Sequence, residues 1–150
     1  MKKSNLIVVL TLLVAGTVKA QIHDPVKWST SAKKVSDTEY ELIATAHIED
    51  GWHLYAQSVP DDGPRPTVFS FEGNSNYLKK GNTKEAEGHT VDDPIFEMRI
   101  KYFSEETAFK QRIKLKNDTP FKVNGVVEFM VCNDEMCLPP KEVDLTFEVK

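Results

Sequence analysis

The feature that most constrains the fold is an alternation of apolar and polar residues with a period of two. It is clearest between residues 40 and 48, where the alternating apolar set is Tyr40, Leu42, Ala44, Ala46 and Ile48. The same period recurs in later segments, namely 96–102, 109–115, 126–132 and 143–149. An extended strand directs successive side chains to opposite faces, so this period predicts strands with one face toward a core. No stretch longer than a turn has helical periodicity, and the sequence therefore predicts an all-β fold.

Turn signals divide the chain into short segments. Asp50-Gly51 precedes an aromatic, strand-like run at 52–56, and the proline-rich residues 59–67 predict a loop before a short strand at 68–71. Residues 74–93 are polar and predict a long surface connection, with one weak strand near Tyr77-Leu78. Roughly seven to nine short strands in about 130 residues predict an immunoglobulin-like β-sandwich, with a closed barrel as the alternative.

The start of the chain has the layout of a secretory signal peptide. Two lysines precede an apolar run from Leu6 to Ala15, and short side chains at 18–20 precede an expected cleavage before Gln21. The apolar run is about half as long as a membrane-spanning helix, which disfavours the alternative of an uncleaved anchor. We therefore expect an exported, periplasmic protein in which residues 1–20 are removed and residues 21–150 form one domain.

Composition narrows the class of protein further. The formal net charge is −4 for the whole chain and becomes −7 when residues 1–20, with three lysines and no acid, are removed. Such a chain, without a block of basic residues, is not expected to bind nucleic acid, because that binding depends on neutralising phosphates. Two cysteines are too few for an all-cysteine zinc site or a disulfide-dense mini-protein.

The most informative stretch is Cys132-Asn133-Asp134-Glu135-Met136-Cys137-Leu138-Pro139-Pro140, which lies between two strand patterns. Its cysteines can form a disulfide that is either structural or redox-active. A third interpretation, half of a metal site, needs ligands from His23, His47, His53 or His89, and none has ligand-like spacing. Closing a loop of about six residues stabilises a fold by only about 2 kcal/mol, which favours redox chemistry without excluding a structural bridge. The acids within the loop disfavour a thiolate, which favours a reducing couple.

This stretch resembles the cysteine signature of the N-terminal periplasmic domain of the thiol:disulfide interchange protein DsbD. The resemblance rests on Cys132, Cys137 and the following prolines, and on Gly51-Trp52-His53-Leu54-Tyr55 and Pro66-Thr67 in the same order along the chain. It implies an immunoglobulin-like sandwich with a reversible disulfide. Such a domain accepts electrons from a membrane-embedded thiol reductase and passes them to periplasmic oxidoreductases with thioredoxin folds. Cys137 would form the mixed disulfide with those partners, and Cys132 would resolve it.

The resemblance also implies a cap loop over the cysteine pair, at residues 92–96 in this chain. Phe96 or Ile95 would shield the disulfide, although the alternation makes Phe96 equally suitable as the first core residue of its strand. Asp92 and Asp93 would tune thiol protonation, or they form only a solvated turn before a proline.

Two strand residues complete the expected site, and the chain departs from the family pattern in three places. Tyr55 and His53 would line the disulfide, or they simply pack in their strand. His53 stands where an aromatic hydroxyl is expected, and the loop between the cysteines is about one residue shorter than in well-known members. The sequence ends at Lys150 without a membrane segment or a Cys-x-x-Cys domain, so the electrons would come from a separate protein.

We therefore expect a periplasmic thiol–disulfide carrier of the protein-disulfide reductase type, acting through Cys132 and Cys137. It would need no cofactor and no metal, and it would not span the membrane after cleavage of the signal peptide. The alternative is an exported β-sandwich that binds a protein or saccharide and has a purely structural disulfide.

Overall fold

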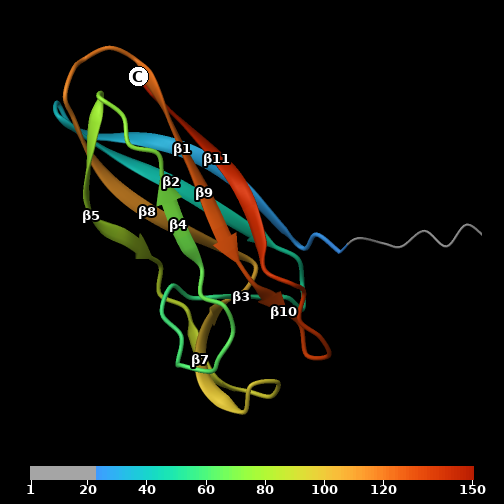
Figure 1. Cartoon of the computed structure of the whole chain (residues 1–150). Helices are drawn as coiled ribbons and strands as arrows, with labels where there is room; N and C mark the ends of the chain where they lie inside the picture. Colours follow the sequence, from blue (N-terminus) through green and yellow to red (C-terminus); the bar gives the residue numbers. More distant parts are fainter. Residues whose placement is uncertain (1–22) are drawn as a thin grey trace, which may run out of the picture.

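The computed structural model describes residues 23–150, so the expected signal peptide lies outside the described residues. The described chain forms antiparallel strands in three sheets (Figure 1). The first sheet has the order β1 (Val26–Ser36), β2 (Glu39–Ile48), β8 (Glu106–Leu115) and β5 (Tyr77–Glu85). The second has the order β11 (Lys141–Val149), β9 (Phe121–Phe129) and β4 (Val68–Phe71). The third has the order β10 (Val131–Cys132), β3 (His53–Tyr55), β7 (Met98–Phe103) and β6 (His89–Asp93).

Within residues 23–150, no helix has the length and apolarity needed to cross a membrane.

The first two sheets pack against each other and enclose the main core. In β2 the apolar side chains predicted from the alternation are buried, which confirms both the strand and the face that it buries. Trp28 of β1 reaches across to the second sheet, where its ring lies 5.8 Å from Phe69 of β4 and 5.5 Å from Phe129 of β9 between ring centroids. Two antiparallel sheets with a shared apolar interior confirm the immunoglobulin-like β-sandwich.

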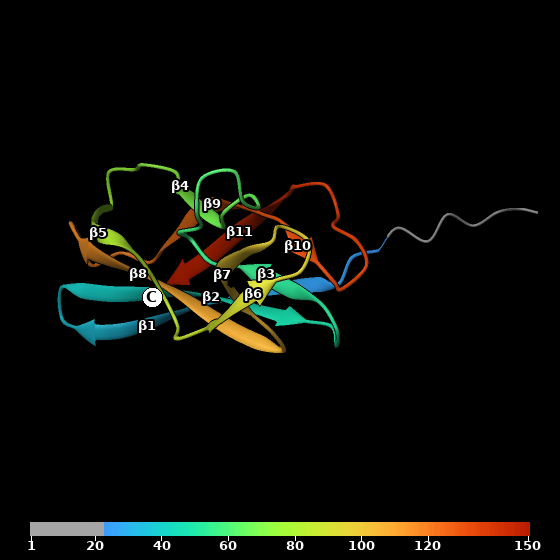
Figure 2. The ribbon, with the colours of Figure 1, turned by 90° about the horizontal axis from the view of Figure 1, so that it is seen from below.

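The third sheet lies at one end of the sandwich, away from the C-terminus (Figures 1 and 2). Residues alternate between its two faces, as in any strand. Leu54, Phe103 and Val131 point into the main core, whereas Tyr55 and Cys132 belong to a second, smaller apolar cluster. One face of this sheet is therefore anchored in the sandwich, and the other carries the cysteine that the sequence singled out.

The strands are more numerous than expected, since the described residues form eleven of them. Residues 74–93 are not a long surface connection but contain β5 and β6, both at sheet edges. Most β5 side chains are exposed, so this strand has no apolar alternation that would have revealed it. A bulge at Gly81, with φ of 68°, is held by the buried Gln111 amide, which donates to the Lys80 and Gly81 carbonyls.

The predicted strand at 126–132 is also divided. β9 ends at Phe129, and after Met130 the chain continues as β10, which pairs with β3 of the third sheet. This change of sheet moves Cys132 out of the main sandwich and places it beside β3.

Candidate functional site

The site is built around a disulfide between Cys132 and Cys137, so both cysteines of the sequence are bonded to each other. Cys132 ends β10 and is 1% exposed, whereas Cys137 is only half-buried. A visiting thiol therefore meets Cys137 first. Beside it, Met136, Leu138 and the two following prolines contribute to the lining of a groove of about 500 Å³.

The loop between the cysteines has its own hydrogen bonds. The Asn133 amide nitrogen donates to the Met136 carbonyl at 2.9 Å, and the Asn133 Oδ1 accepts from the backbone N–H groups of Glu135 at 3.0 Å and Met136 at 2.8 Å. At the base of the loop, the Leu138 N–H donates to the Val131 carbonyl at 2.9 Å. Asn133 was not among the residues predicted for the site, although an asparagine two or three residues before backbone donors is a known turn signal.

Strand pairing brings the other site residues to the same face of the third sheet. Cys132 is paired with His53, and Tyr55 with Tyr102 on β7. Directly paired residues of antiparallel strands project to the same side, so Tyr55 and the disulfide share one face. They are in contact within the second apolar cluster, together with Ile100.

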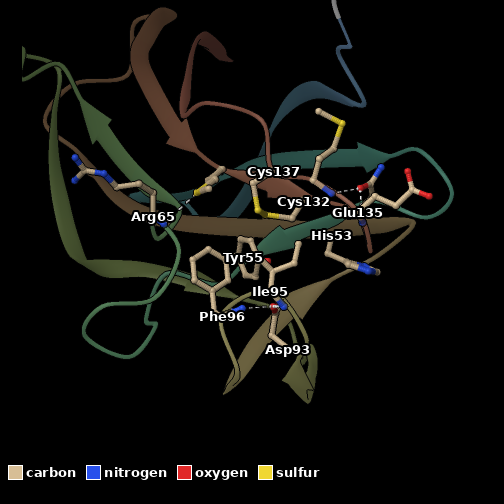
Figure 3. Close-up of a disulfide and its surroundings, with 12 residues drawn as sticks. His53, Tyr55, Arg65, Asp93, Ile95, Phe96, Cys132, Glu135 and Cys137 are labelled. Carbon is tan, nitrogen blue, oxygen red and sulfur yellow. Dashed lines mark hydrogen bonds between the residues drawn. A yellow bond between two sulfur atoms is a disulfide. The ribbon is translucent and has the colours of Figure 1, made fainter.

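Asp93 is tied to this cluster by hydrogen bonds. Its carboxylate is 4% exposed and accepts from the Tyr55 hydroxyl at 3.0 Å, from the Ile95 N–H at 2.9 Å and from the Phe96 N–H at 3.1 Å (Figure 3). Burial, and then the Asp93 carboxylate, raises the pKa of Tyr55 above its usual range, so the hydroxyl stays a donor. Asp93 is therefore not part of a solvated turn. Asp92 is exposed, lies opposite Arg99 in the register of β6 and β7, and is outside this network.

A turn at residues 94–97 covers the disulfide cluster from the end of β6. The Phe96 ring packs edge-on against Tyr55 at 5.9 Å between centroids, and it belongs to the same apolar cluster as both cysteines. Ile95 is 39% exposed instead. Of the two candidate shields, Phe96 is the more buried and packs against the cluster that contains the cysteines, so its role as a shield stays a prediction. The alternative that Phe96 is the first core residue of its strand is wrong, because it lies in the turn, before β7 begins at Met98.

His53 lies at the rim of the site. Its ring stacks on Tyr102 at 4.2 Å between centroids, and its Nε2 lies 3.5 Å from the Asp134 Oδ1 in the cysteine loop. Figure 3 shows the imidazole directed away from the sulfur atoms. His53 thus contacts the cysteine loop through Asp134.

The structure also identifies Thr67 as a supporting residue. This side chain is buried, and its hydroxyl donates to the Tyr55 carbonyl at 2.6 Å. Pro66-Thr67 is one of the motifs on which the resemblance rests. The hydrogen bond from Thr67 to Tyr55 joins residues that lie 12 positions apart, and the sequence pattern did not predict it. Among residues 23–150, no group of three or more His, Cys, Asp and Glu side chains is arranged to hold a metal ion.

The family model for the N-terminal part of the thiol:disulfide interchange protein DsbD matches residues 23–148. The chain belongs to this family. Membership of the DsbD N-terminal family supports a general role in thiol–disulfide exchange, which is an oxidoreductase chemistry. A search of the curated proteins finds no match.

The chain is also similar to solved structures. The N-terminal periplasmic domain of ScsB from Proteus mirabilis has a TM-score of 0.61 at 17% identity, and the alignment covers 83% of this chain and 46% of that one. The reduced DsbD N-terminal domain from Neisseria meningitidis has a TM-score of 0.49 at 17% identity, covering 81% and 83% of the two chains. A complex of the DsbD and PilB N-terminal domains from the same organism gives 0.48 at 16% identity, covering 81% and 80%.

Proposed function

We propose that the Cys132–Cys137 disulfide opens and closes as the protein carries reducing equivalents in the periplasm, from a membrane-embedded thiol reductase to proteins with thioredoxin folds. The observation that carries this proposal is the unequal burial of the two cysteines. Cys137 is half-buried and Cys132 is enclosed, while Phe96 packs in the same cluster from a turn. Family membership and a periplasmic relative support the compartment and the chemistry.

The reaction proceeds in two exchange steps. In the reduced protein, the Cys137 thiolate attacks the disulfide of the partner, forms a mixed disulfide and releases one partner sulfur as a thiolate. The Cys132 thiolate then attacks the Cys137 sulfur and releases the second partner thiolate. The two thiols of this protein lose two electrons and two protons, and the partner disulfide gains both. The membrane reductase reverses these steps to restore the dithiol.

The assignment of roles follows from access to the two sulfur atoms. A partner can reach Cys137 once the Phe96 turn moves, whereas Cys132 stays buried in one cluster with Tyr55 and Ile100. The enclosed sulfur is suited to attack within the molecule, where no approach from outside is needed. The groove lined by Met136 and Leu138 adjoins Cys137 and offers an apolar surface to the docked partner.

A cap over the disulfide must keep its own conformation and must also be able to move away from the cysteines. The three hydrogen bonds on Asp93 hold the 94–97 turn over Tyr55. The turn contacts the cysteine cluster through the side chain of Phe96, and this contact involves no strand pairing. Lifting the turn therefore breaks no pairing of the third sheet.

Trapping of the intermediate tests the proposal. Reduced Cys132→Ser protein is mixed with a purified thioredoxin-fold oxidoreductase in its disulfide form, and products are separated without reductant. We expect a covalent adduct to accumulate, because the resolving thiol is missing. Dithiothreitol should cleave this adduct. The matched Cys137→Ser variant should give none. Equal adducts from both variants, or no adduct while the wild-type bridge resists thiol reductants, would contradict the proposal.

The proposed compartment has a separate test. Export predicts a mature protein that starts at Gln21, with residues 21–150 as its folded domain. Mass spectrometry of the protein from a periplasmic fraction should give a mass without residues 1–20. A full-length protein confined to the cytoplasm would contradict the assignment.

A further inference from the structure

The loop between the cysteines is held by contacts that do not involve sulfur. Asn133 makes three of them, one through its backbone N–H and two through its side-chain oxygen, and the Leu138–Val131 bond closes the base. A side-chain oxygen that accepts from backbone N–H groups two and three residues later forms an Asx turn. The backbone of the loop is therefore organised independently of the bond between Cys132 and Cys137.

No other side chain in the loop is comparably placed. Asp134, Glu135 and Met136 are exposed. Among residues 23–150, the Glu135 side chain has no hydrogen bond or ion pair, and that of Asp134 has only the 3.5 Å contact with His53. In the part of the chain that the structure describes, Asn133 is therefore the one residue of the loop whose side chain accepts hydrogen bonds from the loop backbone.

We propose that Asn133 is a positioning residue that holds Cys132 and Cys137 together in the dithiol state, and that it thereby sets the stability of the disulfide. This inference rests on the proposed function, since it concerns the open form of the same cysteine pair. An intramolecular disulfide forms more readily when its thiols are already held close, because less loop entropy is lost on closure.

The direction of the effect follows from comparing the two redox states. In the disulfide form the covalent bond keeps the loop closed with or without the Asn133 oxygen. In the dithiol form the loop of an Asn133→Ala variant loosens, so closure must then order the loop again. The variant disulfide is therefore less stable relative to its dithiol. The two hydrogen bonds that the Asn133 side chain accepts limit the size of the effect. We expect the equilibrium constant for forming the disulfide from the dithiol to be about tenfold lower in Asn133→Ala.

Three variants separate this role from a general disturbance of the loop. Asn133→Ala removes the acceptor oxygen, and Asn133→Asp retains it at the same place. The negative charge that Asn133→Asp adds acts mainly on thiolates, and free thiols of ordinary pKa, about 8.5, are mostly protonated at neutral pH. Glu135→Ala changes the same loop without removing any bond, because Glu135 contributes only its backbone N–H.

The experiment is a redox equilibrium of each purified variant in dithiothreitol buffers of defined ratio at neutral pH. Free thiols are alkylated and counted by mass spectrometry. We expect Asn133→Ala to favour the dithiol about tenfold more than wild type, which is about 30 mV for a two-electron couple. Asn133→Asp and Glu135→Ala should stay within about twofold of wild type.

The proposal is overturned if Asn133→Ala stays within that range, or if Glu135→Ala shifts the equilibrium as much. Thermal unfolding of the oxidised variants checks that each is folded, and Asn133→Ser, with a shorter and weaker acceptor, should give an intermediate shift. The measurement uses no partner protein. A missing adduct in the trapping experiment would therefore refute the carrier function without affecting this result, and the reverse also holds.

Discussion

Phe96 packs against the cluster that contains both cysteines, from the turn between β6 and β7, and we expect truncation of its ring to alanine to expose the disulfide to small thiols. Complete burial of a phenylalanine side chain contributes about 2–3 kcal/mol, and an edge-to-face pair adds about 1 kcal/mol. Phe96 is only half-buried and has one such pair, with Tyr55. We therefore assign about 1.5 kcal/mol to the contacts that keep the cap closed, which corresponds to a factor of about ten in the ratio of closed to open molecules.

The assay is the rate at which glutathione reduces the disulfide, followed by alkylation of the released thiols. We expect Phe96→Ala to be reduced about tenfold faster than wild type. Ile95→Ala is the matched control, because Ile95 lies in the same turn and is more exposed, at 39%. Its rate should remain within about twofold of wild type.

The equilibrium between disulfide and dithiol supplies a second readout. A shield that slows access to Cys137 slows both reduction and reoxidation, so the reduction potential of Phe96→Ala should match that of wild type. The reasoning fails if Phe96→Ala is reduced at the wild-type rate, or if Ile95→Ala accelerates the reaction equally. In either case the ring of Phe96 would not be what limits access.

Other residues give further predictions. Tyr55→Phe removes a donor from the buried Asp93 carboxylate, and we expect a loss of about 1–3 kcal/mol in the free energy of unfolding, measured with urea. Burial raises the pKa of Tyr55 and Tyr77, so both should remain un-ionised in an alkaline titration followed by phenolate absorbance when ordinary tyrosines, with pKa near 10, have ionised. The stability that these raised values represent is fully present below the unfolded pKa and is lost as the pH rises through the folded pKa. Gly125→Ala would place a Cβ 2.6 Å from the Ser70 carbonyl oxygen, so thermal unfolding should show a loss of about 1–3 kcal/mol as β4 and β9 separate.

The main sandwich could be predicted from the sequence because its information is local. In β2, β8 and β11 each buried side chain is followed by one that is more exposed, so a single strand already indicates which face it buries. The cysteine pair is local as well, because its members are separated by 5 positions along the chain. The redox roles of these cysteines remain predictions.

The rest of the site depends on pairing between distant segments. Asp93 reaches Tyr55 only because β6 pairs with β7 and β7 pairs with β3, and β6 has no alternation that identifies it as a strand. The sequence could not distinguish Asp92 from Asp93, since only the register of β6 decides which acid faces the cluster. The role of Phe96 was equally open, because its apolar period continues into β7 while its backbone belongs to a turn.

The third sheet separates two properties that a disulfide carrier must adjust. Its strand order places β10, with Cys132, at one edge and β6, with Asp93, at the other, and Tyr55 on β3 lies between them. The cap turn is fixed through Asp93, and the cysteine loop is fixed through Asn133, with no hydrogen bond between the two in the described residues. We therefore propose that access to the sulfur and the stability of the sulfur–sulfur bond are controlled from opposite edges of this sheet. A shield changes the barrier to exchange and not the two end states, so a change at Phe96 should alter the rate of exchange without altering the equilibrium that Asn133 is proposed to set.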